Sequence, residues 1–200
     1  MKLTRFERQF VNSTTNAERV ARVAIPLLEQ VALPPKPRCL ELGCGQGVVT
    51  RLLVERHSAQ VTASDYDPGQ VALAQERLAD LDGQVEFRIV DARAMPFDDA
   101  QFDAIAAFQV MHHIPGGWRE MVAEVARVLK PGGCFIFTDM VLTSRLGWLV
   151  RCLPSWLDQL EESALHACLA ENGLRLEHYA RGRGVLSALL GHCAAIARSI

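Results

Sequence analysis

Short apolar runs alternate with amphipathic stretches along the middle of the chain. Five apolar runs have the composition of buried strands, at residues 39–42, 60–64, 85–90, 102–107 and 134–138. Apolar positions at helical spacing fall between most of these runs, at residues 48–55, 69–81 and 118–129. Repeated strand, helix, strand units predict a doubly wound α/β domain, which is a mostly parallel sheet with helices on both faces and right-handed crossovers.

The N-terminal segment has the pattern of an amphipathic helix. Apolar residues recur at helical spacing over residues 16–32. Thr15 and Glu18 have the spacing of a capping box, which predicts that the helix begins there. Pro26 lies inside the pattern, and we expect it to kink or split the helix because proline lacks an N–H donor.

The pattern loosens after the fifth apolar run. Residues 140–160 are too apolar for a solvated loop and too interrupted to cross a membrane, so we expect a buried helix or a hydrophobic flap. The alternative is a patch that meets an apolar substrate or makes peripheral contact with a membrane surface. A helix over residues 161–172 is expected to end at Gly173. Residues 175–179 have a strand pattern, whereas the apolar positions from Leu186 onward also fit a helix.

Composition and charge narrow the classes of function. The 200 residues are 50% apolar and 22% charged, which fits one globular domain. The net charge of −2 argues against a broad electrostatic surface for nucleic acid or anionic lipid. No apolar run is long enough to span a bilayer and the first residues lack a signal-peptide pattern, so we expect a soluble, cytoplasmic protein. The six cysteines are scattered without zinc-site spacing, which predicts reduced, buried thiols and no metal site.

A glycine-rich turn follows the first predicted strand, in the pattern Glu41-x-Gly43-x-Gly45-x-Gly47. Glycines let the backbone turn tightly and approach a ligand closely, and the helix start that follows supplies unpaired N–H groups. Asp65 ends the second predicted strand, where a carboxylate can accept hydrogen bonds from the two hydroxyls of a ribose. These features predict a nucleotide-like ligand. Dinucleotide-binding folds use a similar turn, so the glycines alone do not choose the cofactor.

Glu41 favours a ligand that carries an amino group. A carboxylate just before the first glycine can bind a positively charged amino group through charge-assisted hydrogen bonds, whereas a hydride-transfer site gains little from it. The structural alternative is a carboxylate that caps or fixes the loop.

These residues and three further motifs resemble the class I S-adenosylmethionine-dependent methyltransferases, over residues 32–139. In chain order the first four motifs are Glu41-x-Gly43-x-Gly45-x-Gly47, Asp65-Tyr66, Asp91-Ala92, and residues 102–105 with 111–114. The fifth is Leu129-Lys130-Pro131-Gly132-Gly133, which resembles the turn before the fifth strand. The resemblance implies a Rossmann-like sheet of about seven strands with the last strand antiparallel. It places a final hairpin at about 175–181 and 189–198.

The resemblance also implies S-adenosylmethionine as the cofactor and S-adenosylhomocysteine as the product. In the family the glycine turn cradles the methionine part, and an acid at the position of Asp65 binds the ribose. Tyr66 occupies the position that flanks adenine, and Asp91 with Ala92 looks like the step that meets the adenine edge. The implied cofactor-binding set is Glu41, Gly43, Cys44, Gly45, Gly47, Asp65, Tyr66, Asp91, Ala92 and Gln109.

Methyl transfer from a sulfonium is an in-line displacement, so positioning of the two reactants can supply much of the rate and a protein base is optional. His112 and His113 follow the fourth predicted strand, and Asp139 ends the fifth. Ligand sites in open α/β sheets lie beyond the carboxyl ends of the strands, which makes these three residues the catalytic candidates. The alternatives are local hydrogen bonding for the histidines and capping of the following segment for Asp139.

The sequence favours a small acceptor with an apolar, aromatic or lipid-like body. Residues 106–109 lack the Asn/Asp-Pro-Pro-aromatic signature of base methylation, and no basic stripe indicates a nucleic-acid partner. We therefore divide the chain into an N-terminal helical lid at 1–33 and a methyltransferase domain at 34–200 with an apolar flap at about 140–160. The side chains expected to roof the acceptor are Phe6, Phe10, Val11, Trp148 and Trp156.

Two other classes of function compete with methyl transfer. The first is an NAD(P)-binding Rossmann oxidoreductase, against which stand Glu41, the GxGxG spacing and the absence of a Tyr-x-x-x-Lys relay. The second is a catalytically silent member of the methyltransferase fold that acts as a binding partner. The sequence implies no particular oligomeric state.

Overall fold

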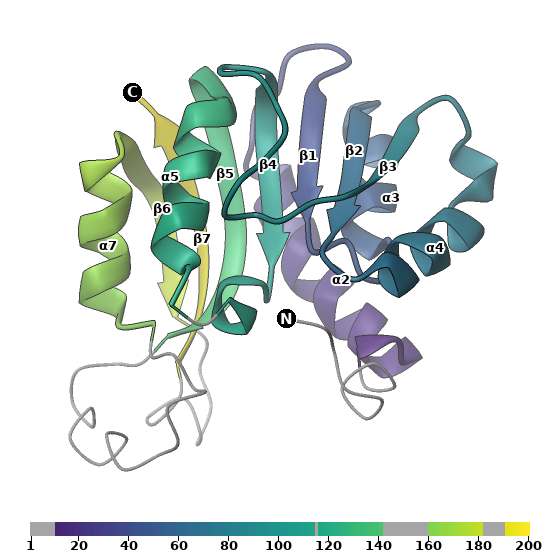
Figure 1. Ribbon diagram of the computed structural model, residues 1–200, viewed down its shortest axis with the longest axis horizontal. Helices are drawn as coiled ribbons and strands as arrows, with labels where there is room; N and C mark the ends of the chain where they lie inside the picture. Colours follow the sequence, from purple (N-terminus) through teal and green to yellow (C-terminus); the bar gives the residue numbers. More distant parts are fainter. Residues whose placement is uncertain (1–10, 115, 142–159, 182–190) are drawn as a thin grey trace.

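The computed structural model describes residues 11–114, 116–141, 160–181 and 191–200 (Figure 1). Within these ranges the strands are β1 (Arg38–Leu42), β2 (Gln60–Asp65), β3 (Val85–Ile89), β4 (Phe102–Phe108), β5 (Leu129–Val141), β6 (Leu174–Arg181) and β7 (Gly191–Ser199). The α-helices are α2 (Thr14–Glu29), α3 (Val48–His57), α4 (Pro68–Arg77), α5 (Trp118–Val128) and α7 (Glu162–Glu171). Two short 3₁₀ turns complete the described part, η1 (Ala79–Leu81) and η2 (Met111–His113).

The strands of the described part form one seven-stranded sheet in the order β3-β2-β1-β4-β5-β7-β6. Strands β1 to β5 pair in parallel, and β7 is antiparallel to both of its neighbours, β5 and β6. The predicted α/β sheet with an antiparallel last strand is confirmed. Successive strands are added in opposite directions on the two sides of the β1–β4 pair, and the carboxyl ends at such a switch point are where a doubly wound sheet binds ligands.

Two apolar cores lie on the two faces of the sheet. In Figure 1, α5 and α7 lie in front of β4, β5, β6 and β7, and α2 and α3 lie behind the sheet. The front core joins α5 and α7 to the fully buried rings of Phe135 and Phe137 on β5. The rear core joins α2 and α3 to apolar side chains of β1, β2, β4, β5 and β7. Helices on both faces keep the parallel strands out of water, as such sheets require.

The N-terminal helix differs from its prediction in its start. It begins at Thr14, and the hydroxyl of Ser13 accepts a hydrogen bond from the Asn16 N–H at 3.2 Å. The predicted capping box of Thr15 and Glu18 was therefore wrong, because Ser13 occupies the N-cap position two residues before Thr15. Pro26 lies within α2, and the helix continues past it to Glu29.

The last strands differ from the sequence pattern in length. Strand β5 begins at Leu129, whereas the pattern predicted a strand over residues 134–138. Leu129 pairs with Phe102, and the register then shifts so that Ala104 pairs with Cys134, which indicates a bulge where a turn was expected. The C-terminal helix considered in the sequence is replaced by β7, which pairs with β6 in the hairpin that the resemblance implied.

Some predicted features lie outside the described residues. Among them are the expected roof residues Phe6, Phe10, Trp148 and Trp156, and most of the proposed flap. Of that flap, Met140 and Val141 belong to β5, and Leu160 is buried in the front core. Within the described residues, no helix has both the length and the apolar character needed to cross a bilayer.

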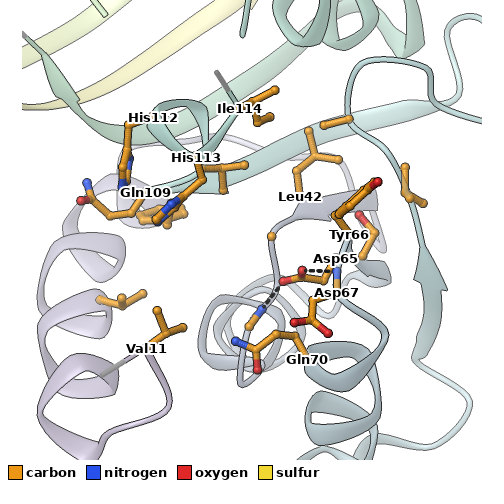
Figure 2. Close-up of a pocket in the computed structure, with 18 of the residues that line it drawn as sticks. Val11, Leu42, Asp65, Tyr66, Asp67, Gln70, Gln109, His112, His113 and Ile114 are labelled. Carbon is orange, nitrogen blue, oxygen red and sulfur yellow. Dashed lines mark hydrogen bonds between the residues drawn. The ribbon is translucent and has the colours of Figure 1, made fainter. Parts of the chain in front are cut away.

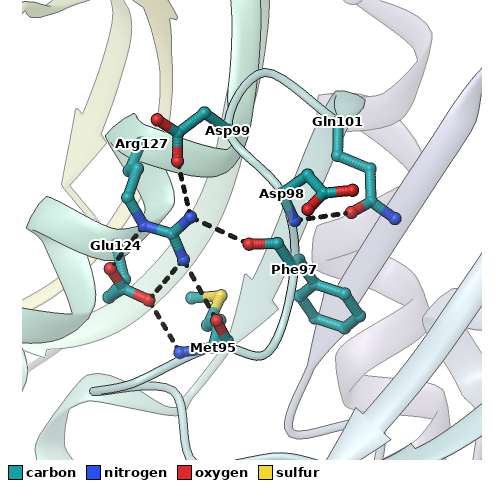
Figure 3. A network of polar contacts seen from close by, with 7 residues as sticks. All are labelled: Met95, Phe97, Asp98, Asp99, Gln101, Glu124 and Arg127. Carbon is teal, nitrogen blue, oxygen red and sulfur yellow. Dashed lines mark hydrogen bonds and ion pairs between the residues drawn. The ribbon is translucent and has the colours of Figure 1, made fainter.

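Arg127 fastens the connection between β3 and β4 to helix α5 (Figure 3). Its guanidinium donates to Glu124 at 2.7 and 2.8 Å, to Asp99 at 2.7 Å, and to the carbonyl oxygens of Met95 and Phe97 at 3.0 and 2.8 Å. Glu124 also accepts the Met95 N–H at 2.7 Å. The five donors of one guanidinium thus hold a connection that has no helix of its own.

We expect Arg127→Ala to lower the free energy of unfolding by roughly 2–3 kcal/mol, because it leaves two part-buried carbonyl groups and Glu124 without their donors. The matched control is Arg56→Ala, which removes a single exposed ion pair with Glu29. That loss should cost less than about 1 kcal/mol. Urea denaturation of both variants measures the difference, and equal losses would show that Arg127 does not hold this connection.

Candidate functional site

A cavity of about 650 Å³ opens at the carboxyl edge of the sheet, where β1, β2 and β4 end (Figure 2). Its walls come from the glycine turn, the end of β2, the segment after β3, the turn η2 and the start of α2. The predicted site residues that line it are Gly43, Gly45, Asp65, Tyr66, Asp91, Ala92, Gln109, His112 and His113. The predicted residues outside its lining are Glu41, Cys44, Gly47 and Asp139.

The turn after β1 depends on its glycines. Gly43, Gly45 and Gly47 have φ angles of +68°, +50° and +84°, a region that other residues rarely adopt. A Cβ on Gly43 would lie 2.7 Å from a methyl group of Val110, and one on Gly47 would lie 2.6 Å from a methyl group of Leu78. The glycines therefore let the turn lie against its neighbours and leave backbone N–H groups near the cavity.

Asp65 presents a fixed carboxylate to the cavity. One of its oxygens accepts the Gly45 N–H at 3.2 Å and the other accepts the Asp67 N–H at 2.9 Å (Figure 2). Burial raises the pKa of Asp65, and the two backbone donors oppose that rise. Since each carboxylate oxygen has two lone pairs, both oxygens retain acceptor capacity for a ligand hydroxyl.

Tyr66 and Asp91 also line the cavity. Tyr66 is 47% exposed, so its ring offers a face to a planar group in the cavity. Asp91 accepts the backbone N–H and Nε–H of Arg93, both at 3.0 Å, and pairs with its Nη2 at 2.7 Å. These hydrogen bonds from Arg93 lower the pKa of Asp91. The sequence analysis missed Arg93, although it follows Asp91 by only two residues.

Glu41 is buried beneath the glycine turn and does not line the cavity. The hydroxyl of Thr50, in the first turn of α3, donates a hydrogen bond to the Glu41 carboxylate. Burial raises the pKa of Glu41 to about 8, and the hydrogen bond from Thr50 opposes the rise. This hydrogen bond joins α3 to β1.

Stability should fall with rising pH because of Glu41. Its pKa rises from 4.5 to about 8 on folding, so between these pH values the folded chain keeps a proton that the unfolded chain has lost, and folding must take that proton up. Between about pH 5 and 8 this penalty grows by up to about 1.4 kcal/mol per pH unit. Glu41→Gln removes this titrating group. The free energy of unfolding of the variant minus that of the wild type should therefore increase as pH rises.

Chemical denaturation at pH 5, 6.5 and 8 measures this trend. Glu55→Gln on the exposed face of α3 is the control, since Glu55 pairs with Arg51 at the surface. A difference between wild type and Glu41→Gln that stays constant over this range would contradict the assignment of a proton to Glu41.

His112 and Asp139 form a hydrogen-bonded pair at the cavity. The Nδ1 atom of His112 lies 2.7 Å from one oxygen of Asp139, a fully buried carboxylate. The other oxygen accepts the N–H groups of Val110 at 3.1 Å and Met111 at 2.7 Å. With Nδ1 bonded to the carboxylate, Nε2 of His112 is the ring nitrogen that can accept a proton.

The structure places the three catalytic candidates differently with respect to the cavity. His112 and His113 both line the cavity, with ring centroids 4.0 Å apart. Asp139 is 0% exposed and touches the cavity only through the groups that it orients. Through these hydrogen bonds Asp139 orients the ring of His112 and the turn after β4.

Gln46 connects the start of α2 to the glycine turn. Its Nε2 donates to the carbonyl oxygens of Val11 at 3.0 Å and Ser13 at 3.2 Å, and its Oε1 accepts a hydrogen bond from Arg77. Val11 lines the cavity, as do three residues of α2, namely Asn16, Arg19 and Val20. The sequence motif predicts the glycine turn on either side of Gln46. It does not indicate that Gln46 bonds to the backbone of Val11 and Ser13.

A second cavity of about 210 Å³ lies between α2 and the ends of β4, β5, β6 and β7. It shares Arg19, Val20, Phe108 and Gln109 with the first cavity. Its remaining described lining is mostly small and apolar, namely Val23, Thr138, Ala180, Arg181, Cys193 and Ala194. The shared residues make the two cavities neighbours across the end of β4.

Known proteins match both the sequence and the fold. Residues 39–133 match the methyltransferase domain family. A 27-O-demethylrifamycin SV methyltransferase from Amycolatopsis mediterranei (strain S699) is 33% identical over 132 residues, which are 65% of this chain and 48% of that protein. A phthiotriol/phenolphthiotriol dimycocerosates methyltransferase from Mycobacterium leprae (strain TN) is 36% identical over 143 residues, or 69% and 50%. The chain thus spans about half the length of these curated relatives.

The fold is similar to that of a geranyl diphosphate C-methyltransferase from Streptomyces coelicolor A3(2), solved with Mg²⁺, geranyl diphosphate and S-adenosyl-L-homocysteine. The TM-score is 0.77 at 15% identity, over 94% of this chain and 87% of that one. The family match and these relatives support the resemblance to the class I S-adenosylmethionine-dependent methyltransferases. The family cofactor is accordingly S-adenosylmethionine, and the oxidoreductase alternative is not favoured.

Proposed function

We propose that this chain transfers a methyl group from S-adenosylmethionine to a small molecule with an apolar body. The observation that supports the proposal is that the glycine turn, Asp65 and the His112–Asp139 pair lie at one cavity. A smaller, largely apolar cavity adjoins it across the end of β4.

The described residues fit the cofactor in shape and polarity. The positive φ angles and missing Cβ atoms of the glycine turn let a ligand approach the backbone closely. Asp65 has acceptor capacity for ribose hydroxyls, and Tyr66 and Asp91 offer a ring face and a carboxylate for adenine. When bound, S-adenosylmethionine supplies a methyl group on a positively charged sulfur, which a nucleophile attacks in line.

His112 acts as the general base in this proposal. Its Nε2 accepts the proton of an acceptor hydroxyl or activated carbon acid as the nucleophile attacks the methyl carbon. The buried carboxylate of Asp139 stabilises the imidazolium that forms, and the Val110 and Met111 N–H groups hold that carboxylate in place. His113 lies beside this ring as the second candidate.

The second cavity supports an acceptor with an apolar body. Val20, Val23 and Phe108 line it, and burying such a body there removes apolar surface from water. The matching relatives are named for rifamycin and phthiotriol substrates, and the structural neighbour is solved with geranyl diphosphate. For this chain we propose only the class of acceptor, which is a small, largely apolar molecule and not a nucleic acid.

The N-terminal residues 1–33 serve as a helical lid in this proposal, over a methyltransferase domain at 34–200. The support is local: Val11, Asn16 and Arg19 line the larger cavity, and Gln46 bonds to the backbone beside them. Residues 140–160 are proposed as the flap that completes the acceptor site, and the cytoplasm as the place of the reaction.

Methyl-labelled S-adenosylmethionine tests the proposal. The chain is incubated with a panel of apolar acceptors, including prenylated hydroquinones, sterols and macrolactones, and with catechol, amino acids and transfer RNA as polar competitors. We expect label in an organic-extractable product from the apolar group, and none with Asp65→Ala. Label only in the polar competitors, or none in any acceptor despite cofactor binding, would overturn the proposed acceptor class.

A further inference from the structure

Gln70 is a buried amide that the protein leaves without a partner. It is the third residue of α4 and is 0% exposed, and it forms part of the wall of the larger cavity. Neither its Oε1 nor its Nε2 has a hydrogen-bond partner among the described residues. Figure 2 shows its side chain beside Asp65 and Asp67. Buried amides are nearly always hydrogen-bonded, so this exception calls for a physical cause.

The usual local partner of such a glutamine is already taken. A Gln three residues after an N-cap normally accepts the backbone N–H of the N-cap residue, which here is Asp67. That N–H instead donates to Asp65 at 2.9 Å, and the Asp67 carboxylate accepts the Gly69 N–H at 2.9 Å. Asp65 thus takes the N–H that the Gln70 amide would normally accept, and the amide is left without a partner in the wall of the cavity.

We infer that the amide of Gln70 binds a ribose hydroxyl of the adenosyl ligand, next to Asp65. This inference rests on the proposed function. A ribose diol both donates and accepts, whereas an ionised carboxylate such as Asp65 only accepts. The Gln70 amide supplies the missing donor through Nε2, and the broad terminal torsion of glutamine lets it turn toward the cavity.

This role has an unusual consequence for substitution. Replacing an amide that is hydrogen-bonded in the folded chain lowers the stability of the chain. Replacing a buried amide that has no partner does not, because the change removes an unsatisfied polar group. Gln70→Met keeps the length of the side chain and removes both polar atoms. The variant should therefore bind ligand more weakly while the free chain stays as stable as the wild type or becomes more stable.

Calorimetric titration with S-adenosylhomocysteine, together with thermal unfolding without ligand, measures both effects. We expect Gln70→Met to raise the Kd roughly tenfold, the effect of losing one hydrogen bond. Its unfolding temperature should be unchanged or about 2–4 °C higher. Gln60→Met is the matched control, since Gln60 is exposed at the opposite end of β2, and both quantities should stay at the wild-type values.

Analogues of S-adenosylhomocysteine that lack the 2′- or the 3′-hydroxyl identify the group that Gln70 contacts. With one of the two analogues, Gln70→Met should bind as well as the wild type, because the hydroxyl that the amide contacts is already missing. An equal loss with every ligand, unchanged affinity, or a lower unfolding temperature of the free variant would overturn the inference. A wild type that binds no S-adenosylhomocysteine would instead overturn the proposed function itself.

Discussion

Asp65→Ala is expected to weaken the binding of S-adenosylmethionine and S-adenosylhomocysteine by roughly 100- to 10,000-fold. The carboxylate is held by the N–H groups of Gly45 and Asp67, so its remaining lone pairs are already oriented toward the cavity. Hydrogen bonds to a charged acceptor contribute about 1.5–3 kcal/mol each, and a ribose supplies two. Titration calorimetry on the purified variant measures the loss.

Two further variants separate binding from folding. Asp65→Asn keeps the shape of the side chain and removes the charge, so its loss of affinity should fall between those of the wild type and Asp65→Ala. Asp80→Ala removes an exposed acid that pairs with Arg51 and should bind both ligands normally. If Asp65→Ala bound as tightly as Asp80→Ala, the ribose assignment would be wrong.

His112→Ala should lower kcat by roughly 10²–10⁴ with any acceptor whose nucleophile must lose a proton, the range typical of a general base. Its Nδ1 is bonded to Asp139, and Nε2 is the atom left to accept a proton. The affinity for S-adenosylhomocysteine should change little, because the lost group acts on the acceptor. Single-turnover methyl transfer and calorimetry on the same preparation measure the two quantities.

Neighbouring residues provide the controls for His112. Asp139→Asn keeps an oxygen for the backbone donors and removes the charge that stabilises the imidazolium, so kcat should fall while ligand affinity is retained. His113→Ala should retain most of the activity, since the Asp139 bond belongs to His112. Equal losses in His112→Ala and His113→Ala would remove the basis for choosing His112 as the base.

The centre of the fold was predictable because its signals are local. Each of the first five strands is a short apolar run bounded by turn residues. Such a run can be recognised from consecutive residues alone, without knowledge of which strands pair. The start of β5 was missed because Pro131 and the glycines after it read as a turn, whereas pairing of Leu129 with Phe102 extends the strand. The start of α2 was missed because Ser13 and Thr15 are both good caps, and only packing selects between them.

The candidate site was predictable where a motif fixes it. The glycine turn and Asp65 follow from residue type and position, and the structure brings them to one cavity. The contact between His112 and Asp139 joins residues 27 apart in the sequence, so neither residue alone indicates it. Gln46 and Gln70 carry no chemical signature in the sequence, since the importance of an amide depends on which partners surround it once buried.

The central claim is that this chain binds S-adenosylmethionine at the carboxyl edge of its sheet. Titration calorimetry of the purified chain with S-adenosylmethionine, S-adenosylhomocysteine and NADH tests it most directly. The account predicts saturable binding of one equivalent of each adenosyl ligand, in competition with the other, and no binding of NADH. Binding of NADH alone, or of none of the three ligands, would contradict it.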